Sequence, residues 1–237
     1  MIFANLDKLP PGPILGVTAA FRADPTPDKI DLGVGVYQDE IGRNPIMRAV
    51  SDAERHLLIT ETTKTYQGIA GDPVFNERLL GLLLGAKHRV IEDDRVRGAQ
   101  TPGGCGALRI GAALIQRARP GAKYPYFDAA SGGIDFDAMM DTLAKVGPGE
   151  LVLLHGCCHN PTGADLDLEQ WRALTALALK NGFTPYIDVA YQGLADGVDA
   201  DVAGVRHMLA AVPEAVVATS CSKNFGLYRE RVGAVYF

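Results

Sequence analysis

A lysine follows what reads as a buried strand, in the segment Ser220-Cys221-Ser222-Lys223. The preceding residues, Ala215 to Thr219, are apolar or β-branched, a pattern typical of a strand inside a sheet. A lysine between small hydroxyl residues at such a strand end is partly removed from water, which favours the neutral amine, a nucleophile toward carbonyl groups. Arg231 follows eight residues later and can bind a phosphate in a bidentate manner. An amine nucleophile beside a phosphate anchor is what pyridoxal phosphate (PLP) requires, because a lysine holds that cofactor as a Schiff base.

Three further polar motifs also follow expected strands. A glycine turn, Gly103 to Gly106, follows a strand over residues 95–100 and opens a helix, so that its N–H groups and the helix dipole can hold phosphate. The segments His155 to Asn160 and Asp188 to Tyr191 follow apolar runs over residues 151–154 and 185–188. Because ligands bind beyond the carboxyl ends of parallel strands, we expect all these motifs on one edge of a sheet.

The elements that position these motifs alternate along the chain. We expect strands over residues 95–100, 151–154, 185–188, 215–219 and 232–237. We expect helices over residues 45–60, 73–84, 106–118, 168–180 and 202–211. Asn44-Pro45 and Asp72-Pro73 each combine a capping residue with proline at the first helical position. The alternation predicts an α/β fold with a mostly parallel sheet covered by helices on both faces.

Composition excludes several classes of protein. The 237 residues are 47% hydrophobic and 22% charged, as in an ordinary globular domain. The formal net charge of -5 argues against a nucleic-acid partner. No apolar run reaches the length of a membrane span, and the N-terminus lacks the pattern of a secretory signal. The four cysteines show no disulfide framework, so we expect a cytoplasmic protein.

In this order and spacing, the motifs resemble those of the class I PLP-dependent aminotransferases of the aspartate and aromatic type. The blocks that carry the resemblance, besides the lysine segment, are Asp31 to Tyr37, Tyr66-Gln67-Gly68, Thr101 to Leu108, His155 to Gly163 and Asp188 to Gly193. The resemblance implies the type I fold of PLP-dependent transferases. It also implies an N-terminal arm and substrate-side loop in residues 1–44, and an incomplete large cofactor-binding domain in residues 45–237, with the C-terminal small domain absent.

The resemblance assigns catalytic roles to three residues. Lys223 would hold the cofactor and then move a proton between the substrate α-carbon and the cofactor. Asp188 would pair with the pyridine nitrogen and keep it protonated. Tyr191 and Asn160 would hydrogen-bond the phenolic oxygen of the cofactor, and Gly35 and Asn160 would also contact the substrate.

The remaining cofactor contacts concern the phosphate. Family members usually carry a hydroxyl residue where Cys105 stands, and a thiol is a poorer donor. Tyr66 would reach the phosphate of a neighbouring subunit, because family members are homodimers with shared sites. The phosphate-binding residues implied are Gly103, Gly104, Cys105, Ser220, Ser222, Arg231 and Tyr66.

Two departures from the family pattern bear on function. The segment Arg119 to Ala122 is followed almost directly by the segment Lys123 to Asp128, whereas family members carry a further strand and helix between them, with a tryptophan that stacks on the cofactor. The single tryptophan here, Trp171, lies in an expected helix elsewhere. The sequence also stops at Phe237, before the arginines that bind substrate carboxylates in the family.

Several functions therefore stay open at this stage. The leading expectation is transamination between an L-amino acid, aspartate or aromatic, and a 2-oxo acid such as 2-oxoglutarate. The alternatives are a catalytically inactive remnant or partner-binding fragment of the fold, and a PLP enzyme of another class such as a β-lyase.

A zinc site is the remaining alternative, suggested by His155, Cys157, Cys158 and His159. The spacing is cramped and lacks the usual Cys-x2-Cys or His-x3-His pairs. We therefore expect no metal. His155 is expected to serve as a hydrogen-bonding group near Asp188, and the cysteines as small core residues.

Overall fold

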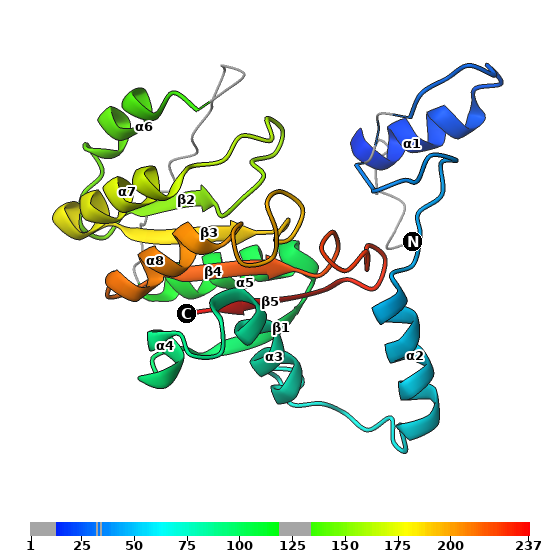
Figure 1. Cartoon of the computed structure of the whole chain (residues 1–237), viewed down its shortest axis with the longest axis horizontal. Helices are drawn as coiled ribbons and strands as arrows, with labels where there is room; N and C mark the ends of the chain where they lie inside the picture. The colour runs from blue at the N-terminus through cyan, green and yellow to red at the C-terminus, as the bar shows by residue number, and fades with distance from the viewer. Residues whose placement is uncertain (1–12, 32, 34, 119–133) are drawn as a thin grey trace, which may run out of the picture. The chain divides into compact units, whose positions relative to one another are not determined.

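The computed structural model of the chain describes residues 13–31, 33, 35–118 and 134–237 (Figure 1). The chain divides into two compact units, residues 1–45 and 46–237. In the first unit, helix α1 (Pro13–Ala23) precedes a segment that turns tightly after Asp39. The Asp39 carboxylate accepts hydrogen bonds from the backbone N–H groups of Ile41 and Arg43, which satisfies the donors of that turn.

Five strands of the second unit form one sheet, in the order β1-β5-β4-β3-β2 (Figure 1). Strand β3 pairs in parallel with both β2 and β4, whereas β5 runs antiparallel to its two neighbours, β1 and β4. Four strands therefore point the same way, and the expectation of a mostly parallel sheet is confirmed with β5 as the exception. The strands are β1 (Gly98–Pro102), β2 (Leu151–His155), β3 (Thr184–Val189), β4 (Val216–Ser220) and β5 (Val232–Tyr236).

The helices of the second unit begin and end largely where local signals indicate. The Asp72 side chain accepts the N–H groups of Val74 and Phe75 at the start of α3, and a capping box of Asp167 and Gln170 opens α7. The helices are α2 (Arg48–Thr60), α3 (Pro73–Leu84), α4 (Arg89–Glu92), α5 (Gly103–Ala118), α6 (Phe136–Leu143), α7 (Leu168–Asn181) and α8 (Ala203–Ala211).

Three expectations about these elements were wrong. Helix α2 begins at Arg48 rather than at Pro45, and its N-cap residue, Met47, makes no side-chain hydrogen bond. Strand β1 begins at Gly98, because its pairing with β5 extends only from Gly98 to Pro102. Helix α5 consequently starts directly after that strand, at Gly103 rather than at Gly106. Helices α1, α4 and α6 were not expected at all.

Alternate side chains of the strands enter two separate cores. Tyr186 and Val216 pack with Ala107 of α5 on one face of the sheet. Ile187 and Val217 point to the opposite face, in a larger core that includes residues of α3, α7 and α8. Figure 1 shows α5 behind the sheet and α7 and α8 in front of it. The expectation of helices on both faces is thus confirmed.

The described strands form an unbroken hydrogen-bonded sheet with β2 at one end. The place at which a strand and a helix of the family are expected to be missing, Arg119 to Asp128, lies outside the described residues. The order of the five strands therefore does not depend on a strand from that segment. Among the described residues, no helix combines the length and the apolar character needed to span a bilayer.

Candidate functional site

Lys223 lies just beyond strand β4, at the carboxyl edge of the sheet. All five residues of β4 are buried, and the Cys221 N–H donates to the Val232 carbonyl, which holds the chain against β5 past the end of the strand. The Lys223 ammonium nitrogen lies 5.0 Å from the centre of the Tyr191 ring. A cation over an aromatic face is attracted by the ring electrons, so Tyr191 helps to position this amine.

Asp188 belongs to the neighbouring strand β3 and lies between His155 of β2 and Ala218 of β4 in the sheet register. Burial raises the pKa of this carboxyl to about 6, although the positive charge of Lys223 acts in the opposite direction. A partly buried carboxylate with a raised pKa favours a cationic or N–H-bearing partner at this position.

Tyr191 follows β3 by two residues and is half-buried. Burial raises the pKa of its phenol, and the nearby groups of Asp188, Cys158 and Tyr228 raise it further. The phenol therefore keeps its proton at neutral pH and can donate a hydrogen bond.

Arg231 packs directly on the backbone of Gly103, where β1 ends and α5 begins. A Cβ atom at Gly103 would lie 2.6 Å from Nη2 of Arg231, and the φ of Gly103 is 70°. Both observations require glycine at this position. The Arg231 guanidinium also donates through Nη1 to Ser222 Oγ (3.3 Å) and to the Tyr228 carbonyl (3.0 Å).

Two serines, one at the end of β4 and one in the β4–β5 connection, complete this cradle. Ser220 lies against Gly104, since a Cβ atom there would be 3.1 Å from Ser220 Cβ. The Ser222 N–H donates to Ser220 Oγ (3.1 Å). Cys105 is exposed in the first turn of α5. A guanidinium, two hydroxyl groups and a helix N-terminus thus face one another, an arrangement that suits a phosphate.

Asn160 lies in the connection after β2, where its side chain is exposed. Its backbone N–H donates to Nδ1 of His155 (3.4 Å), and the rings of His155 and His159 lie 4.6 Å apart. Burial lowers the pKa of His155, and the neighbouring His159 lowers it further, so His155 is neutral at physiological pH.

Three residues of the sequence analysis lie apart from this group or are not placed with it. Gly35 belongs to the first unit, and a Cβ atom there would meet nothing within 4 Å. Tyr66 lies between α2 and α3 with its side chain fully exposed. Trp171 lies in a helix, α7, as expected from the sequence, and is buried there against Gly204 of α8, which makes it a core residue.

The structure adds one group that sequence reasoning missed. Tyr228 provides the carbonyl that holds Arg231, and its phenol lies near enough to Tyr191 to raise the pKa of that residue. Its position between Lys223 and Arg231 in the sequence was the available signal, because both ends of that short segment point to the same ligand.

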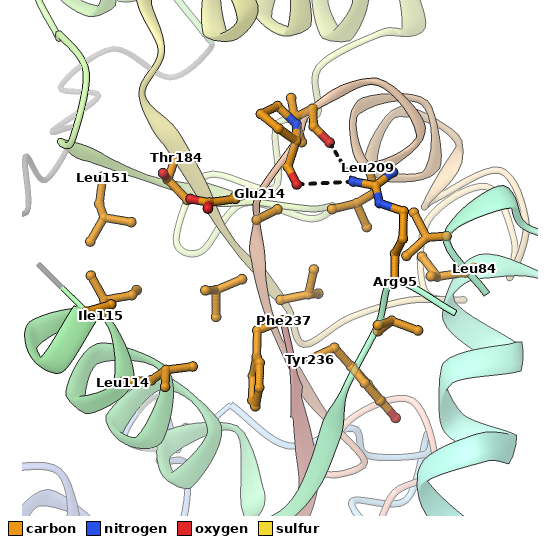
Figure 2. A pocket seen from close by; sticks show the side chains of 18 of the residues that line it. Leu84, Arg95, Leu114, Ile115, Leu151, Thr184, Leu209, Glu214, Tyr236 and Phe237 are labelled. Carbon is orange, nitrogen blue, oxygen red and sulfur yellow. Dashed lines mark hydrogen bonds between the residues drawn. The ribbon is translucent and has the colours of Figure 1, made fainter. Parts of the chain in front are cut away.

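A cavity of about 390 Å³ lies at the opposite edge of the sheet (Figure 2). It is lined by the first residues of three parallel strands, Leu151, Thr184 and Val216, and by Phe237 after the end of β5. Its lining is mostly apolar; the guanidinium of Arg95 donates to the Pro213 carbonyl (3.1 Å) at its rim. Because the polar motifs follow the other ends of these strands, the cavity is separate from the Lys223 group.

Fold and site together define a class: an α/β domain that presents a lysine amine, a carboxylate and an anion cradle at the carboxyl edge of its sheet. The family model described as "Aminotransferase class I and II" matches residues 27–123 and 120–237. The chain therefore belongs to this family, whose members are PLP-dependent aminotransferases. The two matched segments meet at the place where the sequence indicated an internal deletion.

Similar proteins agree with this assignment. The chain is 45% identical over 257 residues to the aspartate aminotransferase of Escherichia coli, with 98% of this chain and 65% of the relative covered. It is 46% identical over 258 residues to the tyrosine aminotransferase of Rhizobium meliloti, with 99% and 66% covered. An aromatic-amino-acid aminotransferase of Burkholderia pseudomallei, solved covalently bound to pyridoxal phosphate, superposes with a TM-score of 0.91 at 38% identity, covering 100% of this chain and 65% of that one. The chain thus spans about two thirds of the length of these relatives.

Proposed function

We propose that this chain binds PLP at the carboxyl edge of its sheet and uses it to transfer an amino group between an L-amino acid and a 2-oxo acid. The observation that carries the proposal is the convergence of three elements. Strand β4 leads to the Lys223 amine, β3 carries the Asp188 carboxylate, and the β4–β5 connection brings Arg231 onto Gly103.

The donor set fits the cofactor. The phosphate would be held by Arg231, by the hydroxyls of Ser220 and Ser222, and by the free N–H groups at the start of α5, next to Gly103 and Gly104. Glycine at position 103 keeps the backbone open to the Arg231 guanidinium, whereas a side chain would displace it. Cys105 supplies a thiol where a hydroxyl is usual, so this contact is weaker.

The reacting groups have complementary protonation states. Bound PLP supplies an electron-withdrawing ring that stabilises negative charge at the substrate α-carbon. Asp188 would accept the hydrogen bond of the protonated ring nitrogen, which restores the ionised form that burial disfavours. Tyr191 retains its proton and would donate it toward the phenolic oxygen, together with Asn160. The amine of Lys223, beside Tyr191, would take up and return the α-proton.

The substrates are inferred from the relatives. Aspartate, tyrosine and aromatic-amino-acid aminotransferases all match the chain at similar identity, so we propose an aspartate or aromatic donor with an acceptor such as 2-oxoglutarate. Asn160 and Gly35 are the proposed substrate contacts. The four cysteines are free, which supports our proposal of a cytoplasmic location.

Absorbance spectroscopy of the purified chain with added PLP tests the proposal. We expect a visible band that saturates with the cofactor, and borohydride should fix the cofactor to the peptide containing Lys223, as read by mass spectrometry. Lys223→Ala should abolish the fixation and all turnover. Lys180→Ala, at the exposed end of α7, is the matched control and should behave as the original chain.

The same experiment separates the alternative functions. A folded chain without a cofactor band would be a catalytically inactive remnant or a partner-binding fragment. Cofactor binding with release of pyruvate from a cysteine conjugate, in the absence of any 2-oxo acid, would instead indicate a β-lyase. Turnover that persists in Lys223→Ala would refute the role of this lysine.

We further propose that the chain forms a homodimer in which Tyr66 reaches the phosphate bound by the partner subunit. Helix α2 has no buried residue, and Leu58 and Ile59 near its end are 87% and 82% exposed. Tyr66 and Ile69 follow on the same exposed stretch. Such a run of apolar side chains is typical of an interface.

Sedimentation analysis tests the dimer. Leu58→Glu should shift the chain from dimer to monomer, because a charge on a buried interface is strongly unfavourable. Leu194→Glu is the control at an exposed leucine elsewhere in the second unit, and should leave the dimer intact. A monomeric original chain would overturn this part of the proposal.

A further inference from the structure

Two adjacent thiols and a carboxylate meet in the connections that follow β2 and β3. The Sγ atoms of Cys157 and Cys158 and a carboxylate oxygen of Asp201 all lie within 4.8 Å of one another. We propose that these three residues form a binding site for a thiophilic divalent cation such as Zn²⁺. None of the three ligands belongs to the proposed cofactor contacts.

The three ligands come from two different connections of the fold. Cys157 and Cys158 follow β2, and Cys158 adopts the left-handed region with a φ of 49°. Asp201 lies just before α8, in the connection that follows β3. Parallel strands β2 and β3 place these two connections side by side at the same edge of the sheet.

Asp201 is held rigidly. Each of its carboxylate oxygens accepts two backbone N–H groups, at 2.7 to 3.2 Å, from Gly193, Ala195, Asp196 and Gly197. These four hydrogen bonds fix the carboxylate next to the thiols, so Asp201 is a preformed ligand rather than a mobile surface group.

The electrostatics of the group favour a cation. The Asp165 carboxylate accepts the backbone N–H of Cys158 and therefore lies against the same connection as the two thiols. A divalent cation held by the thiols and Asp201 would be attracted by both carboxylates.

Binding would follow ordinary metal–thiolate chemistry. Each thiol would release its proton to solvent as its sulfur bonds to the metal, so one cation replaces two protons without any oxidation or reduction. Asp201 would add an oxygen ligand, and water the fourth position of a tetrahedral site. Because the oxygens of Asp201 are already hydrogen-bonded, the thiolates dominate affinity. Soft cations such as Cd²⁺ and Zn²⁺ should therefore bind, whereas Mg²⁺ and Ca²⁺ should not.

The structure revises the zinc hypothesis of the sequence analysis in a specific way. Nδ1 of His159 is hydrogen-bonded to the hydroxyl of Thr162 (2.8 Å), and Nδ1 of His155 accepts the backbone N–H of Asn160. Neither histidine belongs to the group formed by the two thiols and Asp201. The third ligand of the thiols is instead Asp201, more than forty residues away in the sequence. We therefore replace the expectation of no metal with a site built on Cys157, Cys158 and Asp201.

Ultraviolet titration of the reduced full chain with Cd²⁺ tests the site, because cadmium–thiolate bonds absorb where the metal alone does not. We expect a charge-transfer band that saturates at one equivalent, is removed by competing Zn²⁺ and is unaffected by excess Mg²⁺. The double variant Cys157→Ser/Cys158→Ser should lose the band, whereas Cys105→Ser and Cys221→Ser, which remove the other two thiols, should retain it.

Circular dichroism establishes that each variant is folded. If the double variant does not fold, Cys158→Ser decides the matter, because Cys158 is less buried than Cys157. Loss of a direct ligand should weaken Cd²⁺ binding by more than the ~10–100-fold typical of losing an outer-shell partner. Absence of a saturable band in the original chain would overturn the proposal, as would a band that depends on Cys105 or Cys221.

Discussion

The two edges of the sheet differ in the chemical character of their residues. At the carboxyl edge, the strands end in a lysine, a half-buried carboxylate and a glycine of positive φ that contacts an arginine. At the opposite edge, the same strands begin with apolar residues around a cavity, together with Leu83 and Leu84 of α3 (Figure 2). This domain thus gains stability from apolar packing at one edge of the sheet and places its charged groups at the other.

The largest expected effect lies at the apolar edge. Leu83 is 1% exposed, so Leu83→Ala should lower the free energy of unfolding by about 2–5 kcal/mol, as is usual for a buried leucine. The PLP affinity of the molecules that remain folded should not change. Urea denaturation and a cofactor titration measure the two quantities, and Leu179→Ala, at a leucine of α7 that is 51% exposed, is the control, with an effect below about 0.5 kcal/mol. A parallel loss of PLP affinity would show that the two edges are coupled.

The next effect lies at the carboxyl edge and should appear in PLP affinity. Gly103→Ala adds a Cβ atom 2.6 Å from Arg231 and should weaken PLP binding by roughly 100-fold, because a charge-assisted contact to phosphate contributes about 1.5–3 kcal/mol. Gly42→Ala introduces the same strain, at a φ of 76°, with no atom within 4 Å, and should leave PLP affinity unchanged. Equal effects of both variants in a fluorescence titration would mean that strain, and not the displacement of Arg231, is responsible.

A third effect, also at the carboxyl edge, depends on pH. Folding raises the pKa of Asp188 from its ordinary 3.8 to about 6, so the cofactor-free fold favours the protonated form. The contribution of Asp188 to stability should therefore fall as the pH rises from about 4 to about 6 and then stay constant, with a total loss of up to about 3 kcal/mol. Asp188→Asn should remove this decline, making the variant more stable than the original chain at pH 8 while it binds PLP more weakly. Urea denaturation at pH 4, 6 and 8 measures the difference, and parallel curves for both proteins would contradict it.

Local signals in the sequence were sufficient for most elements that position the site. Apolar runs located β2, β3 and β4, and the Asp72 cap located α3, because those patterns act within a few residues. The local signals were less accurate at the boundaries of two elements. Asn44-Pro45 was expected to open a helix, yet α2 begins at Arg48. Strand β1 is confined to the five residues that pair with β5.

For the residues of the site, too, some features were predicted from the sequence and others are visible only in the structure. The roles proposed for Lys223 and Arg231 were predicted from their types and from the strand before them, and the role of Asp188 from the resemblance to the family. That Arg231 lies on Gly103 was not, because it depends on β5 running antiparallel to β1 and β4 and so starting at the carboxyl edge. The pairing of Cys157 and Cys158 with Asp201 was equally inaccessible, since no local spacing connects residues on separate loops.

The sequence by itself thus determined the family and the alternation of strands and helices, and it predicted the reactive groups, because these depend on residue type and short-range order. Only the tertiary structure decided which groups meet. The direction of β5 and the register of β2, β3 and β4 are settled by the packing of two cores against the faces of the sheet. Those contacts join residues far apart in the sequence, and for that reason they set the neighbours of Arg231, Asp188 and Asp201.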